Sequence, residues 1–284
     1  EFLINRYSIG HIYSNRVFKD RFHQNIDKDL SKILHLNEIS WVQTNQFGIQ
    51  LNKRNRKTWS KNWHHFANEA NLYYPRKTEF IKTSNIYSKQ LTGTLSMNNQ
   101  KGGLCSAKNL LESFIEDRHK NYSKLMSSPI TASESCSRLS PHITFGTISI
   151  RKIVKRINES ISRKKKLDLK SIYSFRKRLA WHCHFIQKFY DEPDIEYKNL
   201  HPSYDGLRDK ELNYCFLKKW KNGKTGFPFL DACLRCLKHT GWLNFRMRAM
   251  IVSFAAYQLW LDWKIFSNFL AKNFTDYEPG IHYS

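Results

Sequence analysis

Acidic residues are scarce in this sequence. Its 284 residues include 24 Asp and Glu against 47 Lys and Arg, which gives a formal net charge of +23 at pH 7. A strongly basic surface attracts polyanions, and nucleic acid is the first candidate for such a partner. Two alternatives stay open: a compositional drift toward Lys, Asn and Ile without selection for binding, and attraction to a membrane surface.

Disulfide frameworks, metal motifs and long apolar runs are also lacking. The six cysteines are scattered, which favours reduced thiols inside a cell. Cys233 and Cys236 form a CxxC pair followed by His239, but no second ligand pair follows, so we expect no metal site. The longest apolar stretch, 249–261, is too short to span a bilayer, and no signal peptide is visible. We therefore expect an intracellular protein without membrane contact.

Apolar residues make up 40% of the chain and aromatic residues 14%, enough to bury a sizeable core. Beyond residue 104 the apolar positions repeat at helical spacing, most clearly in a stripe over 150–161 with Lys and Arg on the opposite face. Ser140 as N-cap and Pro141 at the first helical position predict one helix start, and Ser149 predicts another. With neither an internal repeat nor a βαβ alternation, this part is predicted to be mostly α-helical.

Three longer helices are predicted in the second half, over 172–190, 230–238 and 243–263, with Gly241 ending the second.

The first 65 residues differ from the rest. Short strands are predicted at 39–42 and 47–51. Trp59 and Trp63 are four residues apart and share one face of a basic aromatic helix or linker. A polar stretch at 75–104, with several Gly and Thr, predicts a loop or a domain linker.

Five motifs occur in order between residues 136 and 278. They are Cys136-Ser137-Arg138-Leu139-Ser140-Pro141-His142 followed by Phe145-Gly146; Trp220 with Gly223-Lys224-Thr225-Gly226-Phe227-Pro228 and Asp231-Ala232; Thr240-Gly241-Trp242 with Arg246 and Arg248; Leu261-Asp262-Trp263; and Asp276-Tyr277-Glu278. Together these motifs resemble those of the DNA photolyase/cryptochrome family, strongly from about residue 104 onward and more weakly before it.

The resemblance implies a domain organisation. Residues 1–65 would be the end of an N-terminal α/β, Rossmann-like antenna domain, 66–104 a linker, and 105–284 a mostly α-helical FAD-binding domain. Because the chain begins with Glu1 instead of Met and stops soon after a strong motif, we expect a fragment that lacks both ends.

The resemblance also implies FAD as cofactor, active in its reduced form. A pyrophosphate is bound by hydroxyls, backbone N–H groups and helix N-termini, and Ser137 and Ser140 offer hydroxyls at a helix start, although by themselves they could be a helix cap only. The full set of expected cofactor-binding residues is Tyr122, Ser137, Arg138, Leu139, Ser140, Phe175, His182, Arg248, Asp276, Glu278 and His282.

Four of these residues carry specific expectations. Arg248 and Asp276 resemble the family's buried Arg–carboxylate pair beside the flavin ring, since a desolvated charge needs a partner; a surface ion pair is the alternative. Glu278 replaces the family's usual Asp with one more methylene. His282 falls where the residue facing flavin N5 sits, commonly Asn, and a His there would titrate near neutral pH.

The resemblance implies catalytic roles for Trp181, Arg178 and Trp263. Trp181 matches a Trp that stacks on a flipped-out pyrimidine dimer, which is worth ~1–3 kcal/mol per base; a core Trp is the alternative. Trp263 matches a middle member of a chain of tryptophans that carries electrons to the flavin. Two positions depart from the pattern: Arg178 replaces a Glu that hydrogen-bonds the dimer in well-known bacterial photolyases, and Phe245 replaces an Asn near the flavin, for which Asn244 could substitute.

The function implied is that of a deoxyribodipyrimidine photo-lyase: FAD-dependent, light-driven repair of cyclobutane pyrimidine dimers by electron transfer from excited reduced flavin. Its expected partner is damaged DNA, and we expect a monomer. A cryptochrome-like blue-light photoreceptor without repair activity is the alternative, favoured slightly by Arg178 and His282 and opposed by the net charge. A nucleic-acid-binding module that has lost flavin is a third hypothesis. The antenna chromophore and the type of lesion stay unassigned.

Overall fold

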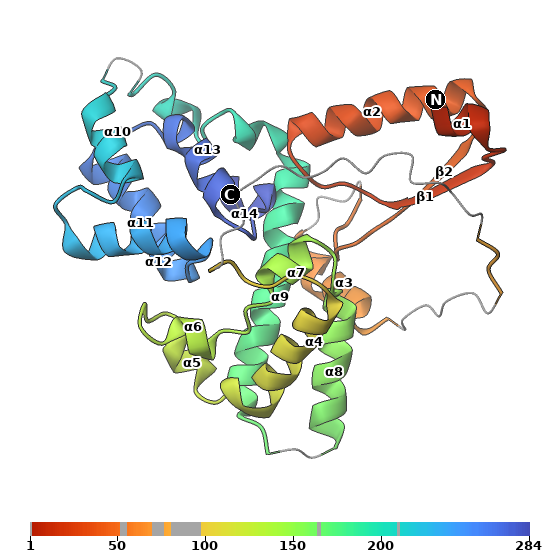
Figure 1. Cartoon of the computed structure of the whole chain (residues 1–284), viewed down its shortest axis with the longest axis horizontal. Coiled ribbons are helices and arrows are strands. Elements are labelled where there is room, and N and C mark those ends of the chain that lie inside the picture. The colour runs from red at the N-terminus through yellow and green to blue at the C-terminus, as the bar shows by residue number, and fades with distance from the viewer. Residues whose placement is uncertain (1, 52–55, 70–76, 81–97, 164–165, 209–210) are drawn as a thin grey trace.

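The computed structural model describes residues 2–51, 56–69, 77–80, 98–163, 166–208 and 211–284 (Figure 1). Most of the linker expected at 66–104 therefore lies outside the described residues. Two parallel strands at one side and helices throughout the rest make up the described chain, so the mostly α-helical fold predicted from the sequence is confirmed.

The N-terminal part is a βαβ unit. Strands β1 (His11–Asn15) and β2 (Ser40–Thr44) pair in parallel over their whole length, and helix α2 (Arg21–Leu36) connects them, as parallel neighbours require a crossover. The short helix α1 (Phe2–Arg6) precedes it. The α/β character predicted for this part is confirmed.

The predicted strands are only partly confirmed. The strand predicted at 39–42 overlaps β2, β1 was not predicted, and the strand at 47–51 is wrong. That segment instead crosses to the helical part, where Phe47 and Ile49 are buried and the backbone N–H of Gln50 donates to Gln187 Oε1 at 2.6 Å. Its apolar residues pack into the helical core, and its backbone bonds to a side chain instead of a neighbouring strand.

Helix α9 (Leu169–Asp191) runs through the middle of the molecule (Figure 1). Asp168 caps its start by accepting from the Ser171 N–H at 3.2 Å. Its apolar stripe shares one core with α3 (Arg56–Asn68), α4 (Leu104–Ser113) and α8 (Ile150–Ser162).

The helix start predicted at Ser149 is confirmed, because its side chain accepts from the Lys152 N–H. Helix α3 crosses residue 65, and Trp63 and Phe66 lie in the same core as α9, so the last part of the predicted antenna segment packs on the helical part.

A second core lies beside the first and is built from α10 (Tyr214–Lys221), α11 (Pro228–Thr240), α12 (Phe245–Ser253) and α13 (Trp263–Asn273). Trp220 is fully buried at its centre and its indole N–H donates to the Ile251 carbonyl at 3.2 Å. Gly241 ends α11 in the left-handed conformation, at φ +68°, as its position in the sequence predicted.

Two helix predictions need correction. The prediction of a single helix over 243–263 is wrong. Helix α12 passes into a π-helical turn (Phe254–Gln258), where helical structure ends, and a separate helix, α13, begins after its N-cap Asp262. Ser140 is not an N-cap: it is the first residue of α7 (Ser140–Thr144), and the preceding Leu139 occupies the cap position without a side-chain hydrogen bond.

Short elements complete the described chain. They are a π-helical turn (Phe114–Arg118), α5 (Tyr122–Leu125), α6 (Ala132–Ser135), two 3₁₀ turns (Pro193–Glu196 and Pro202–Tyr204) and α14 (Pro279–Tyr283).

Within the described residues, none of the helices combines the length and the apolar character needed to cross a bilayer.

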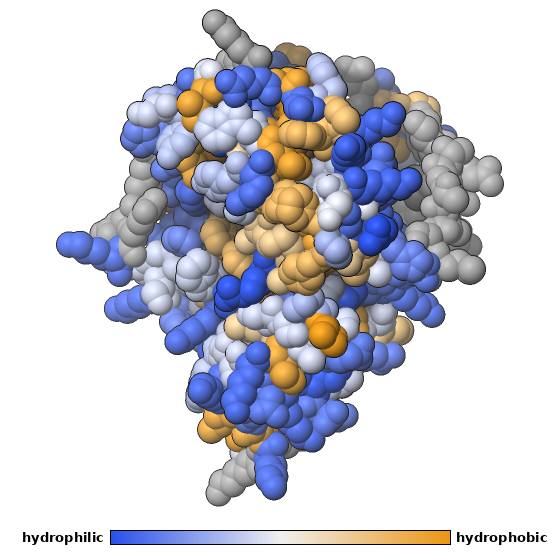
Figure 2. All heavy atoms as spheres, turned by 90° about the vertical axis from the view of Figure 1, so that its left-hand side faces the viewer, coloured by the Kyte–Doolittle hydropathy of each residue, from blue (hydrophilic) through white to orange (hydrophobic). Residues whose placement is uncertain are grey.

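The side of the molecule seen in Figure 2 carries a band of apolar side chains. Exposed apolar residues on or next to α10–α12 include Phe216, Phe227, Phe229, Phe245 and Tyr257.

The contact between α14 and α9 predicts a sharp effect of a small substitution. A Cβ at Gly280 would lie 2.6 Å from Ile186 Cα and 2.9 Å from the Phe185 carbonyl oxygen, so Gly280→Ala forces two backbones apart. We expect a loss of roughly 1–3 kcal/mol in the free energy of unfolding, measured by urea denaturation. Gly10→Ala is the matched control, because nothing lies within 4 Å of a Cβ there. Equal stability of the two variants would contradict the close contact.

Candidate functional site

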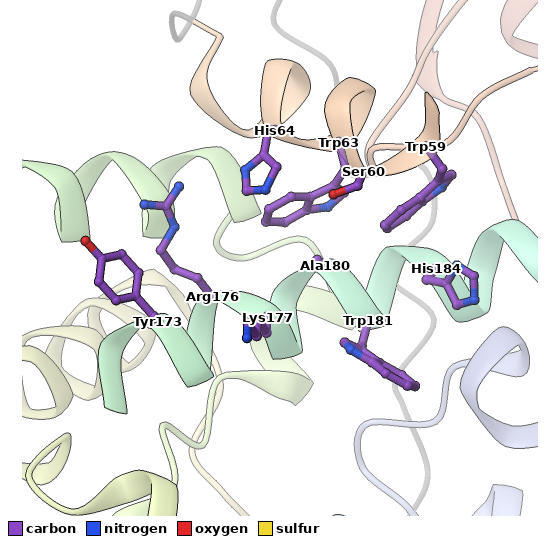
Figure 3. A pocket seen from close by; sticks show the side chains of 10 residues that line it. All are labelled: Trp59, Ser60, Trp63, His64, Tyr173, Arg176, Lys177, Ala180, Trp181 and His184. Carbon is purple, nitrogen blue, oxygen red and sulfur yellow. The ribbon is translucent and has the colours of Figure 1, made fainter. Parts of the chain in front are cut away.

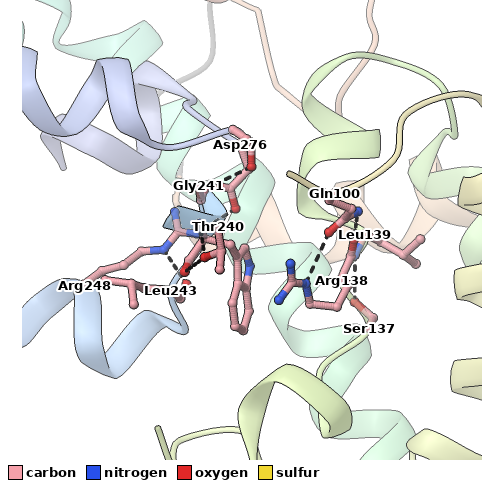
Figure 4. Close-up of polar contacts among 11 residues, drawn as sticks. Gln100, Ser137, Arg138, Leu139, Thr240, Gly241, Leu243, Arg248 and Asp276 are labelled. Carbon is pink, nitrogen blue, oxygen red and sulfur yellow. Dashed lines mark hydrogen bonds and ion pairs between the residues drawn. The ribbon is translucent and has the colours of Figure 1, made fainter. Parts of the chain in front are cut away.

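Two segments that are far apart in the sequence face each other near α9 (Figure 4). One contains Ser137, Arg138 and Leu139, and the other contains the ends of α11 and α13. Arg138 adopts a left-handed backbone, at φ +60°, and Gln100 holds it with two hydrogen bonds, one to its Nε and one to its carbonyl. The Arg138 guanidinium lies 4.0 Å from the centre of the Trp242 ring, which links the two segments.

Arg248 and Asp276 form a largely buried ion pair on the second segment. Arg248 Nη2 lies 2.8 Å from Asp276 Oδ2, and the side chains are 20% and 4% exposed. The Arg248 Nε donates to the Leu243 carbonyl at 2.8 Å, and its guanidinium lies 4.1 Å from the Phe274 ring centre. The structure therefore brings together the two residues that the resemblance paired, in a buried setting instead of at the surface.

Several buried polar atoms beside this pair have no hydrogen-bond partner among the described residues. They are Asp276 Oδ1, both carboxylate oxygens of Glu278 and both ring nitrogens of His182. Buried polar groups in native proteins are nearly always hydrogen-bonded, so such a concentration of unpaired atoms indicates a place for a polar ligand. The donor and acceptor mixture fits the edge of a flavin ring and its ribityl hydroxyls.

Burial controls the charge of these groups. It raises the pKa of Glu278 to about 7, with the charge of Lys19 opposing this shift and that of Asp20 adding to it. It lowers the pKa of His182 to about 4. The same cause lowers the pKa of His282 to about 4, although its bond to the Ser267 carbonyl acts in the opposite direction. The expectation that His282 titrates near neutral pH is therefore wrong, and both histidines are neutral at pH 7.

The Arg248–Asp276 pair and its unpaired neighbours form one wall of the candidate site. The strip of residues from Ser137 to Ser140, with its surroundings, forms the other wall. Leu139 is buried, and its N–H donates to the Ser137 hydroxyl at 3.4 Å. Behind it, Tyr122 and Phe175 meet edge to face with ring centres 6.0 Å apart. Burial raises the pKa of Tyr122, so its phenol stays protonated. Arg178 is exposed, and its charge acts on Tyr122 and Cys136, which locates it at the rim of this wall.

The predicted site residues line two different cavities. Arg248, Asp276, Glu278 and His282 line a cavity of about 230 Å³, together with Trp263. Trp181 is 51% exposed and lines a different cavity of about 760 Å³ (Figure 3).

Some contacts of the site were not predicted from the sequence. Gln100 comes from the stretch assigned as a linker, and no motif pointed to it. Trp242 belongs to a quoted motif, but its contact with Arg138 depends on the tertiary fold. Asn244, considered as a substitute for the family's Asn, is buried and already bonded to the carbonyls of Met126 and Ser128.

Residues 175–284 match the family described as the FAD binding domain of DNA photolyase. The chain is 33% identical over 148 residues to a deoxyribodipyrimidine photo-lyase of Alkalihalophilus pseudofirmus, covering 51% of this chain and 29% of that protein. It is 31% identical over 173 residues to cryptochrome-2 of Arabidopsis thaliana, covering 57% and 27%. The chain belongs to the photolyase/cryptochrome family.

The fold agrees with this assignment. A bacterial class III photolyase from Agrobacterium tumefaciens superposes with a TM-score of 0.80 at 22% identity, over 99% of this chain and 61% of that one. The matched part is less than a third of the length of the two curated relatives named above. These relatives include both photolyases and cryptochromes, so membership of the family leaves repair and photoreception as separate proposals.

The unpaired carboxylate of Glu278 predicts a pH-dependent stability. Between its ordinary pKa of 4.5 and the folded value of about 7, the folded chain holds a proton that the unfolded chain has released. Stability from this group is therefore lost as the pH rises through that window. We expect Glu278→Gln, compared with the parent without cofactor, to gain stability progressively from pH 5 to pH 8, by up to about 3 kcal/mol.

Urea unfolding at several pH values tests this, with the exposed Glu116→Gln as the control. Parallel pH profiles of Glu278→Gln and the parent would show that the Glu278 carboxylate is not held in an unfavourable setting.

Proposed function

We propose that this chain carries the FAD-binding part of a light-driven DNA-repair enzyme that acts on cyclobutane pyrimidine dimers. The observation that carries the proposal is the buried Arg248–Asp276 pair beside unpaired carboxylate and imidazole atoms, opposite the Ser137–Ser140 strip. The net charge of +23 suits a polyanionic partner. The family match supports FAD as the cofactor.

The residues of the two walls would hold FAD in different ways. Ser137 and Ser140 offer hydroxyls for its phosphates, while Arg248 and Asp276 would bind at the ring or ribose. Asp276 Oδ1 and Glu278 provide acceptors for ring N–H groups, and at pH 7 a protonated Glu278 could also donate. When bound in its reduced form, FAD supplies the electron that light makes available to the lesion.

The protein's own residues would bind, orient and shield the reactants. His282 is neutral, and because its Nε2–H donates to the Ser267 carbonyl at 3.0 Å, its Nδ1 can only accept a hydrogen bond. Trp263 lies in the same cavity, and its indole N–H donates to Asn199 Oδ1 at 2.7 Å, which fixes the ring for a role in electron transfer. Trp181 would stack on the lesion, and Arg178 at the rim would contact the DNA. We expect the protein to act as a monomer inside the cell.

A cryptochrome-like photoreceptor is the second candidate. Arabidopsis cryptochrome-2 is among the relatives, and Arg178 places a positive charge where a carboxylate contacts the dimer in well-known bacterial photolyases. Such a protein would bind FAD with the same walls but would not repair DNA.

A repair assay separates the two candidates. The chain, reduced in the presence of FAD and mixed with DNA that contains thymine dimers, is illuminated with blue light, and the remaining dimers are counted against a dark control. We expect dimers to disappear in the light only. Bound FAD that is photoreduced, with no loss of dimers on double-stranded or single-stranded DNA, would contradict repair and favour photoreception.

A further inference from the structure

An arginine that belongs to none of the five sequence motifs bonds to the start of the Ser137–Ser140 strip. Arg118 is the last residue of the π-helical turn that follows α4, and its side chain is half-buried. Its Nε and Nη2 donate to the Ser113 hydroxyl at 3.1 and 3.0 Å, and Nη2 also donates to the Leu110 carbonyl at 2.8 Å. These bonds fix the guanidinium against the last turn of α4.

The remaining bonds of Arg118 reach the segment that leads into the strip. Its Nη1 donates to the Cys136 carbonyl and, at 3.5 Å, to the Glu134 carbonyl, while Nη2 donates to the Ser137 carbonyl at 3.3 Å. A guanidinium presents five N–H groups in fixed directions, so one side chain can hold several carbonyls at once. Arg118 therefore joins the end of α4 to the beginning of the strip.

The backbone of the strip requires such support. Arg138 has a φ of +60°, a left-handed conformation that is costly for a residue with a side chain and persists only where its surroundings hold it. Gln100 holds Arg138 directly (Figure 4), and Arg118 holds the two carbonyls that precede it. The Ser137 hydroxyl accepts from the Leu139 N–H, which leaves its own O–H to donate. The bond to the Ser137 carbonyl thus helps to set where this hydroxyl points.

The π-helical turn that carries Arg118 is itself anchored to the central helix. The next residue, His119, is fully buried, and its Nδ1 lies 3.2 Å from the Phe114 carbonyl. Its Nε2 accepts from the N–H of Asp168, the N-cap of α9, at 3.0 Å. One ring nitrogen donates and the other accepts, as in a neutral imidazole, and burial lowers the pKa of His119. Contacts therefore run from α9 through this turn to the strip.

We propose that Arg118 is a positioning residue, which holds the Ser137–Ser140 strip in the conformation that would bind the phosphates of FAD. The inference rests on the proposed function in taking FAD as the ligand of this strip. All three nitrogens of the Arg118 guanidinium already donate to carbonyls or to the Ser113 hydroxyl. Arg118 thus acts through the geometry of the strip, and its charge does not meet the phosphates directly.

The first test needs no cofactor. Amide hydrogen exchange, followed by mass spectrometry, compares the 284-residue chain with Arg118→Lys, which keeps the charge but loses the planar fork of donors. We expect faster exchange in peptides that cover 136–140, and parental exchange in those that cover 276–284, the other wall of the site. Arg156→Lys is the matched control, because Arg156 is also half-buried but binds Glu112 and Ser160.

The second test measures the affinity for FAD by equilibrium dialysis in the dark. We expect Arg118→Lys to bind FAD roughly 10-fold more weakly than the parent, as for a binding conformation that is populated about a tenth of the time. Arg156→Lys should bind FAD like the parent. Arg118→Gln, which also removes the charge, should lose no more affinity than Arg118→Lys.

The outcomes separate this inference from the proposed function. A parent chain that binds no FAD would contradict the proposed function. If the parent and Arg118→Lys bind FAD equally, with equal exchange at 136–140, the inference alone is overturned. It is also overturned if Arg118→Lys binds FAD normally and Arg118→Gln does not, because charge would then be decisive, or if exchange rises equally in both walls.

A milder variant serves if Arg118→Lys does not fold by circular dichroism. Ser113→Ala removes the hydroxyl to which Arg118 Nε donates, and leaves the arginine in place. We expect the same local rise in exchange at 136–140, smaller in size. Parental exchange of this segment in Ser113→Ala would then overturn the inference.

Discussion

The close approach of α14 to α9 sets the geometry on which the rest of the site depends. Gly280 leaves no room for a side chain against Ile186, so the two backbones touch. The residues just before α14 are therefore pressed onto the central helix, and this buries Asp276 and Glu278 at 6% and 2% exposure. Carboxylates at such a depth require a compensating partner. For Asp276 the partner is Arg248, whereas neither carboxylate oxygen of Glu278 has a hydrogen-bond partner among the described residues.

The site is consequently polar and only partly satisfied by the protein itself. The Arg248–Asp276 pair forms one side of the site, and the neutral histidines His182 and His282 flank it. The buried carboxylate of Glu278, whose pKa burial raises to about 7, completes the site. An apolar core would be more stable than a buried polar set of this kind that leaves several hydrogen bonds unmade. Its retention is explained if a ligand with donors and acceptors along one edge makes the missing bonds, which is the chemistry that a flavin offers.

The helices and the Arg248–Asp276 pair were predictable from the sequence, whereas several details were not. The apolar stripe over 150–161 and the N-cap at Ser149 are features of the local sequence, and such features are sufficient to predict a helix. The strand prediction at 47–51 was wrong because the alternating apolar residues of this segment pack into the core with α9. Such a tertiary contact cannot be inferred from the local sequence pattern. The helix end before Trp263 depends on the N-cap at Asp262, and the mostly apolar residues on either side of it concealed this end in the sequence. His282 was assigned an ordinary pKa because its burial is a property of the fold.

The central claim is that the Arg248–Asp276 pair and its unpaired neighbours form a flavin site. The most direct test equilibrates the chain with FAD, removes free flavin by gel filtration, and measures retained flavin from its visible absorption. Arg248→Met is compared with Lys198→Met, which breaks an exposed ion pair with Asp194. We predict about one FAD per chain for the parent and for Lys198→Met, and little for Arg248→Met when both variants are folded. Equal retention by the two variants, or no flavin on the parent, would contradict the account.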